Sequence, residues 1–400
     1  MHSHTKLVHI TTVPMSLVFL RGQVGFMKRC GIDVHAVSSP GQDLEEFARA
    51  EGISVTPVPM ARRMTPFQDL VAVSRIWRLL RAKRPTIVHA HTPKGGLLGM
   101  IAATLANAPV RIYHIRGLPL LGADGMKRRI LWLTEWLACR LAHRVICVSR
   151  SVQEVAVADG ICAADKMRVL LSGSGNGVDA RVRFDPDAAA PQRETVRARL
   201  GIPMDALVIG FVGRIVRDKG IVELSEAWRT LREAHPRSRL LLVGPVETQD
   251  PIPESVMMSL RNDARVHFLG MDWNTAPLYA AMDVVALPTY REGFPNVPLE
   301  AAAMRLPVVT TRVPGCIDAV MDRVTGILVP ARDAYALQAA LAEYMASAEL
   351  RVQHGRAARA RVLADYQPEA IWEAMFLEYW ALIQERTAQT RALSPLEEIA

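Results

Sequence analysis

Long uncharged segments are missing from this sequence of 400 residues. No stretch of 18 residues lacks a charged side chain, which excludes a membrane-spanning helix. The five cysteines are widely spaced without a Cys-x-x-Cys pair, which excludes a disulfide scaffold and argues against a cysteine zinc site. The first 20 residues have neither a basic region nor a small-residue cleavage site around their apolar run, so no signal peptide is expected. We predict a soluble cytoplasmic protein.

The composition is that of an ordinary globular protein. Hydrophobic residues make up 50% of the chain and charged residues 22%, with 25 glycines and 25 prolines. These values exclude disordered, collagen-like and coiled-coil chains. At about 100–200 residues per domain, the length predicts two domains.

Positive charge gathers in the first half of the chain. Residues 1–185 hold 25 Lys and Arg against 13 Asp and Glu, a net charge of +12. Residues 186–400 hold 23 against 27, a net charge of −4. The imbalance suggests that the first half faces an anionic partner. Nucleic acid, an anionic membrane and a phosphorylated substrate are candidates, and a plain solvated surface is the alternative.

Strand and helix patterns alternate along the whole chain. Short apolar runs rich in Val and Ile lie beside segments with helical periodicity, such as 67–82 and 127–141. This alternation is typical of a parallel sheet with helices on both faces. The expected strands are Leu7–Thr11, Asp33–Val37, Thr86–Ala90, Val110–His114, Arg144–Val148, Arg168–Leu171, Leu207–Val212, Arg239–Val243, Val266–Leu269, Val284–Leu287, Val308–Thr311 and Gly326–Val329.

Two domains follow from this pattern. Around Asp185–Arg193 the alternation lapses into Asp, Pro, Ala and Gln, which predicts a linker over 186–198. The chain is therefore expected to form doubly wound α/β domains over 1–185 and 199–367. Ligands of such folds bind outside the carboxyl ends of the strands, so the expected site is the cleft between the two domains.

The end of the chain predicts one long helix. Apolar and aromatic side chains recur at helical spacing from Ile371 to Ile383. A stripe this wide must pack on protein. We expect a helix over 368–388 and a tail over 389–400.

The segment from Tyr290 to Glu300, Tyr-Arg-Glu-Gly-Phe-Pro-Asn-Val-Pro-Leu-Glu, follows a predicted strand. Asn296 and Pro298 mark a helix start, which places Glu292 in the loop and Glu300 in the first helical turn. Backbone N–H groups between the two carboxylates can hold an anion at the helix N-terminus. The carboxylates can then bind hydroxyls on either side of a phosphate, as in a nucleotide sugar. For Glu300 alone, the helix dipole is a sufficient explanation.

A second glycine-rich segment, 210–220, begins the second domain and reads Gly-Phe-Val-Gly-Arg-Ile-Val-Arg-Asp-Lys-Gly. Its glycines allow a close approach of the backbone to a ligand, and Arg214 and Lys219 at a helix start suit a diphosphate. The chain has 41 Arg but only 7 Lys, and Lys219 is the last lysine. A lysine at this place is therefore unusual for this chain, although an ordinary surface lysine is the alternative.

In this order and separation, the two segments resemble the motifs of the family-4 retaining glycosyltransferases of the GT-B fold. Glu292–Glu300 is similar to the family's E-x7-E motif, and Gly213–Gly220 to its G-R-x4-K-G motif. The resemblance spans essentially the whole chain. It implies an α/β fold of two Rossmann-like domains that face each other across a cleft. It also implies that the C-terminal helix crosses back to the N-terminal domain.

The resemblance assigns the acceptor to the first domain and the donor to the second. Arg214 and Lys219 would hold the donor pyrophosphate, Glu300 would contact the ribose, and Glu292 with the backbone after it would contact the transferred sugar. Loops at Gly244 and Gly270 match places where the family holds the base. The residues expected to bind the donor are Gly213, Arg214, Lys219, Gly244, Gly270, Met271, Glu292, Gly293, Phe294, Pro295, Asn296, Val297 and Glu300.

In the first domain, the resemblance points to His114, which would face the transferred sugar. His91 and Arg116, near the ends of neighbouring strands, are assigned to the acceptor side, although a strand-end histidine is as often structural. The first loop lacks the Gly-Gly of many relatives, and Ser16 would supply a similar contact. No carboxylates accompany His89, His91 and His114 at metal-ligand spacing, so no metal or cofactor is expected.

The implied reaction moves a sugar from a nucleotide-sugar donor, with UDP favoured, to an acceptor hydroxyl with retention. Arg214, Lys219 and the helix amides near 294–297 would stabilise charge on the leaving diphosphate without metal. Glu292 and His114 would orient the sugar. No second carboxylate is placed to form a covalent intermediate, so the resemblance implies front-face displacement.

Three alternatives differ in how well the sequence supports them. A GT-B nucleotide-sugar epimerase would share the fold but would need no acceptor. A Rossmann dehydrogenase would need a G-x-G-x-x-G fingerprint, and the glycines of 173–179 fail because no helix follows at the right spacing. A nucleic-acid-binding module would explain the basic half but not the donor motifs, so no nucleic acid is expected.

The segment Lys127–Arg140 predicts a helix with basic residues at its start and Trp132 and Trp136 on one face. An ordinary helix packing on the sheet is the alternative. Basic beside aromatic side chains suit the surface of an anionic membrane. We therefore predict peripheral binding to the inner face of the plasma membrane and a polyprenyl-diphosphate-linked acceptor in polysaccharide or lipopolysaccharide synthesis. A soluble acceptor is the other possibility.

Overall fold

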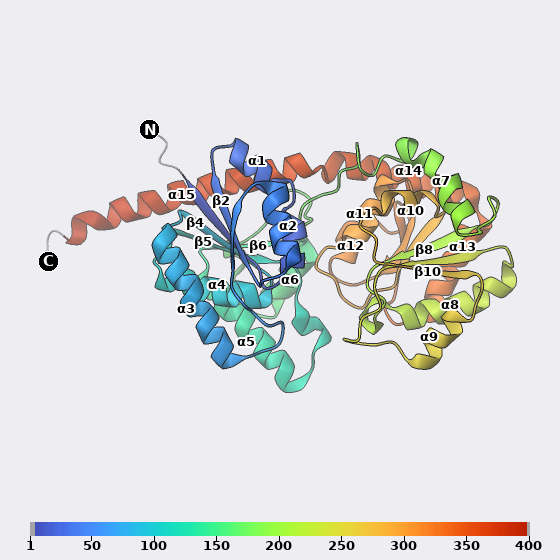
Figure 1. The fold of residues 1–400 in the computed structure, drawn as a ribbon, viewed down its shortest axis with the longest axis horizontal. Coiled ribbons are helices and arrows are strands. Elements are labelled where there is room, and N and C mark those ends of the chain that lie inside the picture. The colour runs from blue at the N-terminus through green and yellow to red at the C-terminus, as the bar shows by residue number, and fades with distance from the viewer. Residues whose placement is uncertain (1–4, 398–400) are drawn as a thin grey trace. The chain divides into compact units, whose positions relative to one another are not determined.

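The computed structural model describes residues 5–397, with side chains described as far as residue 388. The chain divides into two units between Asn176 and Gly177, and the segment from Pro368 returns to the first unit. Each unit has a parallel sheet at its centre with helices on both faces (Figure 1). The expected α/β class is confirmed, but the boundary lies before the predicted one at residue 185.

The sheet of unit 1 has seven strands in the order β3-β2-β1-β4-β5-β6-β7, all parallel. They are β1 Lys6–Ile10, β2 Asp33–Ser38, β3 Ser54–Pro57, β4 Ile87–His91, β5 Val110–Ile115, β6 Arg144–Cys147 and β7 Met167–Val169. Strand β3 was not predicted. It is a short edge strand without fully buried residues, so its sequence lacks the apolar run that marks the others.

The helices of unit 1 cover two different faces of this sheet. They are α1 Gln23–Arg29, α2 Gln42–Glu51, α3 Pro66–Lys83, α4 Pro93–Leu105, α5 Gly125–Leu141, α6 Arg150–Ala158 and α15 Pro368–Glu397, with 3-10 turns η1 Pro14–Leu20, η2 Pro119–Gly122 and η3 Ala164–Lys166. One core lies between the sheet and α3, α4 and α5. A second core lies between the opposite face and α1, α2 and α15.

Unit 2 repeats the arrangement with six parallel strands in the order β10-β9-β8-β11-β12-β13. They are β8 Val208–Val212, β9 Arg239–Val243, β10 Val266–Gly270, β11 Val284–Leu287, β12 Val308–Thr311 and β13 Gly326–Val329. Its helices are α7 Pro186–Arg199, α8 Ile221–Ala234, α9 Glu254–Arg261, α10 Ala276–Ala280, α11 Asn296–Ala303, α12 Cys316–Ala319, α13 Ala334–Ala346 and α14 Ala348–Asp365, with a 3-10 turn η4 Arg217–Lys219. The central strand β8 is buried throughout, as expected for a strand covered on both faces.

The predicted linker over 186–198 is wrong, because these residues form helix α7. The Asp185 side chain caps the helix and a proline takes its first position, both favourable at a helix start. Near its end, the fully buried Arg197 donates to the carbonyls of Ala206 (2.8 Å) and Ala281 (2.9 Å) and pairs with Asp283 (2.9 Å). These bonds fix α7 to unit 2.

The predicted C-terminal helix is present as α15 and packs on unit 1. Its Tyr379 hydroxyl lies 2.7 Å from Nδ1 of His89, and Glu378 forms an ion pair with Arg144 at 2.8 Å. The Trp372 indole donates to the Asn176 side chain at 2.7 Å. The helix continues to Glu397, so residues expected as a tail extend it. Within residues 5–397, no helix combines the length and apolarity needed to span a bilayer.

Candidate active site

The loops at the carboxyl ends of the unit 2 strands bring the predicted donor glycines together. The N–H of Gly213, after β8, donates to Val243 O at 2.9 Å, and the N–H of Gly244, after β9, donates to Gly270 O at 2.7 Å. A Cβ on Gly244 would lie 1.9 Å from the Gly213 carbonyl oxygen. Only glycine at position 244 allows the two backbone segments to come this close. The loops after β8, β9 and β10 therefore lie side by side at the carboxyl edge of the sheet.

The two sequence motifs meet at an ion pair between Lys219 and Glu292. Lys219 ends the turn η4, and Glu292 lies in the loop between β11 and α11. Backbone and side-chain bonds join the two loops: Tyr290 N–H donates to Asp218 O at 2.8 Å, and Arg291 pairs with the Asp218 carboxylate at 2.9 Å. The expected neighbourhood of Lys219 and Glu292 is therefore present, and the two side chains neutralise each other.

Arg214, the other predicted cation, also has a carboxylate partner. Its guanidinium pairs with Glu247 at 2.8 Å, and its side chain is 41% exposed against 16% for Lys219. Glu247 follows β9 and was not among the predicted residues, because no motif links it to Arg214. A ligand that takes both cations must compete with Glu247 and Glu292.

Glu300 lies in α11 just beyond its first turn, because the helix begins at Asn296. The sequence predicts Glu300 within that first turn. The Tyr279 hydroxyl donates to one Glu300 carboxylate oxygen at 2.9 Å. Burial raises the pKa of Glu300, while the Tyr279 hydroxyl and Arg183 oppose that rise. The bond orients the carboxylate and leaves its second oxygen for a ligand hydroxyl. Tyr279 is a site residue that the sequence did not reveal.

The backbone between the two motif glutamates is fixed by packing against neighbouring residues of unit 2. A Cβ on Gly315, which has a φ of 81°, would lie 2.3 Å from the Gly293 carbonyl oxygen. The Phe294 ring packs on Tyr366, with ring centroids 5.5 Å apart. Pro295 then caps α11, followed by Asn296 and Val297 in its first turn. Met271, after β10, is exposed at the same edge of the sheet as the other donor loops.

In unit 1, four histidines gather on one face of the sheet near its carboxyl edge. Register pairs His9 with His89 and His91 with His114 across neighbouring strands. All four side chains are buried, and the His89 and His114 rings stack with centroids 5.4 Å apart. His114 and His91 therefore lie together at this edge of the sheet. Ser16 lies in η1, and no described hydrogen bond joins it to the histidines.

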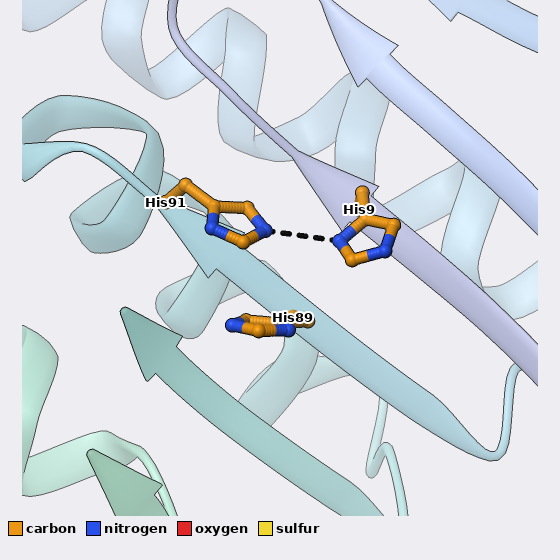
Figure 2. A group of neighbouring side chains, drawn as sticks. All are labelled: His9, His89 and His91. Atoms are coloured by element: carbon orange, nitrogen blue, oxygen red, sulfur yellow. Dashed lines mark hydrogen bonds between the residues drawn. The ribbon is translucent and has the colours of Figure 1, made fainter. Parts of the chain in front are cut away.

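His9, His89 and His91 offer ring nitrogens that lie within 4.8 Å of one another (Figure 2). Nδ1 of His9 and Nε2 of His91 are 2.9 Å apart, a hydrogen-bond distance. The His89 and His91 rings are stacked 4.1 Å apart, so their in-plane lone pairs do not converge on one point. Arg116 donates to Nδ1 of His91 at 3.3 Å and places a cation beside the group. This geometry fits hydrogen-bonded neutral imidazoles better than metal ligands.

The environment of the cluster keeps the imidazoles uncharged. Burial lowers the pKa of His9 to about 3 and, with neighbouring cationic groups, lowers that of His91 well below its usual value. Burial also lowers the pKa of Arg116 to about 9. Arg116 is thus the cation of this region, and the histidines are neutral donors and acceptors around it.

Two family models match the chain: "Glycosyl transferases group 1" over residues 192–361 and "Glycosyl transferase 4-like domain" over residues 18–173. The capsular polysaccharide biosynthesis glycosyltransferase CapM of Staphylococcus aureus is 33% identical over 380 residues, covering 95% of this chain and 98% of the relative. UDP-Gal:alpha-D-GlcNAc-diphosphoundecaprenol alpha-1,3-galactosyltransferase of Escherichia coli is 25% identical, covering 83% of this chain and 86% of the relative.

A solved structure extends the likeness to the fold. The Anabaena protein Alr3699/HepE in complex with UDP superposes with a TM-score of 0.77 at 19% identity, covering 94% of this chain and all of that one. The sequence match to CapM over nearly the full length, the two matched domains and the meeting of both motifs agree with one another. The chain belongs to the family-4 glycosyltransferases of the GT-B fold.

Proposed function

We propose that this glycosyltransferase moves a sugar from a UDP-sugar to a hydroxyl of a lipid-linked acceptor, with retention, in the synthesis of a cell-surface polysaccharide. The Lys219–Glu292 ion pair carries the proposal, because it joins a diphosphate-binding cation to a sugar-binding carboxylate from two separate motifs. The name of CapM supports polysaccharide synthesis, and the Escherichia coli galactosyltransferase, whose name gives a diphosphoundecaprenol-linked sugar, supports the acceptor class. The UDP in that name and in the Anabaena structure supports the donor.

In this proposal the donor replaces the internal partners of both cations. Its diphosphate binds Lys219 and Arg214, which releases Glu292 to accept hydrogen bonds from the transferred sugar. Preorganised cations stabilise the charge that develops on the leaving phosphate and do so without metal. The leaving phosphate accepts the proton of the acceptor hydroxyl, so attack and departure take place on one face of the sugar and its configuration is retained. Glu300, held by Tyr279, binds the ribose.

A donor panel tests the proposed reaction. Enzyme washed free of nucleotide is incubated with UDP- and GDP-sugars, with and without an undecaprenyl-diphosphate-linked monosaccharide, and released nucleotide is measured. We expect UDP release that depends on the acceptor and a product with the anomeric configuration of the donor. A sugar converted without any acceptor would favour a nucleotide-sugar epimerase, and acceptor-dependent turnover of GDP-sugars alone would contradict the UDP assignment.

The outer surface of α3 and α5 supports the proposed contact with an anionic membrane. Both helices pack against α4 on the same face of the unit 1 sheet (Figure 1). At the start of α3, Phe67 is 87% and Leu70 69% exposed, and α5 exposes Met126 (67%) and Leu133 (53%). Large apolar side chains this exposed mark an interaction surface.

The same two helices also expose basic residues. Lys127 and Arg129 at the start of α5 are exposed, as are Arg75 and Arg78 further along α3. Apolar side chains that enter the headgroup layer beside Lys and Arg suit an anionic bilayer, with up to about 1 kcal/mol per basic residue. We therefore propose that unit 1 binds the inner face of the plasma membrane in the cytoplasm.

The prediction that Trp132 forms part of this surface needs adjustment. Its indole N–H donates to Asp159 O at 2.8 Å, and Arg128 pairs with the Asp159 carboxylate at 2.7 Å. Trp132 and Arg128 therefore help to hold α5 in place. Lys127 and Arg129 remain as the basic residues to test.

Liposome flotation tests the membrane contact. Lys127→Ser/Arg129→Ser and Phe67→Ser/Leu70→Ser should each reduce binding to vesicles that contain phosphatidylglycerol, and salt should weaken binding of the unmodified chain. Arg199→Ser, an exposed change in unit 2, removes a cation as a matched control. Equal binding to neutral and anionic vesicles would contradict the membrane surface and favour a soluble acceptor.

A further inference from the structure

Arg116 is a partly buried cation without an acidic partner among the described residues. It follows β5 and directs Nε to Nδ1 of His91 at 3.3 Å and Nη1 to the carbonyl of Gly175 at 3.4 Å. Its guanidinium lies 4.9 Å from the centre of the Phe19 ring. Both hydrogen bonds are long and to neutral acceptors, so the charge is poorly compensated.

Unpartnered donors and acceptors surround this cation. Neither ring nitrogen of the buried His114 has a hydrogen-bond partner, and Nε2 of His9 and Nε2 of His89 lack one as well. Arg116 directly follows β5 and reaches His91 with its Nε, and His114 of β5 pairs in register with the same His91. The site thus combines one fixed positive charge with several imidazole nitrogens that lack partners.

The tautomer of the histidine chain makes it a donor. Arg116 has no acceptor atoms, so it must donate to Nδ1 of His91, which leaves the proton of His91 on Nε2. Nε2 of His91 then donates to Nδ1 of His9, whose own proton lies on the unpartnered Nε2. The Nε2–H group of His9 and the guanidinium of Arg116 are both hydrogen-bond donors. Because one of these donors is positively charged and neither can accept a hydrogen bond, the pair favours an anionic ligand.

The class of anion follows from these groups. A buried charge costs several kcal/mol unless it is paired, and a neutral sugar hydroxyl would leave the Arg116 charge uncompensated. A metal ion would add to that charge. A phosphate group supplies negative charge and several acceptor oxygens, and guanidinium binds phosphate through two parallel hydrogen bonds.

We propose that Arg116 and the Nε2–H group of His9, which His91 holds as a donor, form a phosphate-binding site in unit 1 that holds the diphosphate of the acceptor. The assignment to the acceptor rests on the proposed function, whereas the phosphate site itself rests on the unit 1 geometry. Its residues belong to unit 1, whereas the residues proposed to bind the donor diphosphate belong to unit 2.

Calorimetric titration of inorganic pyrophosphate into the full chain saturated with UDP tests the site, because UDP occupies the donor cations. The unmodified chain should bind pyrophosphate, and Arg116→Gln should weaken that binding at least tenfold. Gly175→Ala offers a second variant that keeps every charge, because its Cβ would lie 2.6 Å from Nη1 of Arg116 and displace the guanidinium. It should also weaken binding, and Arg199→Gln, which removes an exposed arginine of unit 2, should not.

Far-UV and near-UV circular dichroism of each variant verifies the fold, and Arg116→Lys should retain part of the affinity because it keeps the charge. No pyrophosphate binding by the UDP-saturated chain, or equal binding by Arg116→Gln, would overturn the site. Absence of UDP binding in the unmodified chain would contradict the proposed function instead, and is measured separately in the same series.

A second ligand distinguishes a lipid-borne diphosphate from a free anion. Farnesyl diphosphate should bind the UDP-saturated chain at least as tightly as pyrophosphate and should depend equally on Arg116. Binding of pyrophosphate with rejection of farnesyl diphosphate would overturn the assignment to a lipid-linked acceptor.

Discussion

The two units differ in how the cations of their candidate sites are compensated. In unit 2, Lys219 pairs with Glu292, Arg214 with Glu247, and the buried Arg197 with Asp283. In unit 1, Arg116 has only a histidine and a backbone carbonyl, each beyond 3.2 Å. A cation that is already paired with a carboxylate must leave that carboxylate to bind phosphate. A cation without an acidic partner loses nothing, and the phosphate becomes its counter-charge. In the proposed donor site of unit 2, carboxylates of the chain itself therefore pair with both cations, whereas the proposed phosphate site of unit 1 lacks a counter-charge.

The largest expected effect is a difference in stability between variants of the buried Arg197 and the partly buried Arg116. Arg197→Met should lower the free energy of unfolding by about 3–5 kcal/mol, because Asp283 and several carbonyls lose their donor. Arg116→Met should leave stability unchanged or raise it, because it removes an uncompensated charge. Urea unfolding of both variants measures the difference. Equal losses would show that Arg116 is as well compensated as Arg197 and would break the comparison.

The next effect concerns turnover. Lys219→Ala should lower kcat by about 10²–10³, roughly 3–4 kcal/mol, because a preorganised donor to the leaving phosphate is lost. Arg214→Ala should act in the same direction but less strongly, since its side chain is more exposed to water. Steady-state rates at saturating donor test this. Glu247→Gln, which removes only the internal partner of Arg214, is the matched control and should retain most of the activity.

The histidine cluster should make unit 1 sensitive to acid. Burial lowers the pKa of His89 and of His114 well below the usual 6.5, so the folded state keeps them neutral while the unfolded chain binds protons below that pH. Stability should therefore be lost as pH falls from about 6.5, by up to about 1.4 kcal/mol per pH unit for each such histidine.

Urea unfolding at pH 7.5, 6.5 and 5.5 measures this slope. His89→Gln has no imidazole at this position and should reduce the slope. A slope that His89→Gln does not alter would contradict the assignment of neutral buried imidazoles.

The smallest expected effect is that of metal removal. The proposed stabilisation of the leaving phosphate uses Lys219 and Arg214, so extensive treatment with EDTA should leave the initial rate unchanged. Loss of activity that a divalent ion restores would contradict this prediction and would return attention to His9, His89 and His91 as ligands.

Sequence patterns predicted the sheets well because parallel strands buried on both faces must be short and apolar. They missed β3, an edge strand with half-exposed residues, and they misread α7 as a linker. The composition of α7 does not indicate a helix, because the segment has no apolar stripe. Its stability comes from an N-terminal cap and from the bonds of the buried Arg197. Tertiary hydrogen bonds of this kind leave no periodic trace in a sequence.

The candidate site shows the same limit. Glycine and charge spacing, together with the family resemblance, pointed to Arg214, Lys219, Glu292 and Glu300, because cations for a diphosphate and carboxylates for sugar hydroxyls stand at fixed separations in such motifs. The partners Glu247 and Tyr279 lie far from the motifs along the chain and follow no spacing rule. The sequence could not predict that Arg116 lacks an acidic partner either, because this depends on which side chains pack around it in the folded chain.

The central claim is that Lys219 leaves Glu292 to bind the diphosphate of a uridine nucleotide. Calorimetric affinities of UDP and uridine for the unmodified chain and for Lys219→Ala test it most directly, since the two ligands differ only in the diphosphate. The account predicts that the unmodified chain binds UDP far more tightly than uridine and that Lys219→Ala loses most of this difference while its affinity for uridine stays the same. Equal affinities for UDP and uridine in the unmodified chain, or an unchanged preference for UDP in Lys219→Ala, would contradict it.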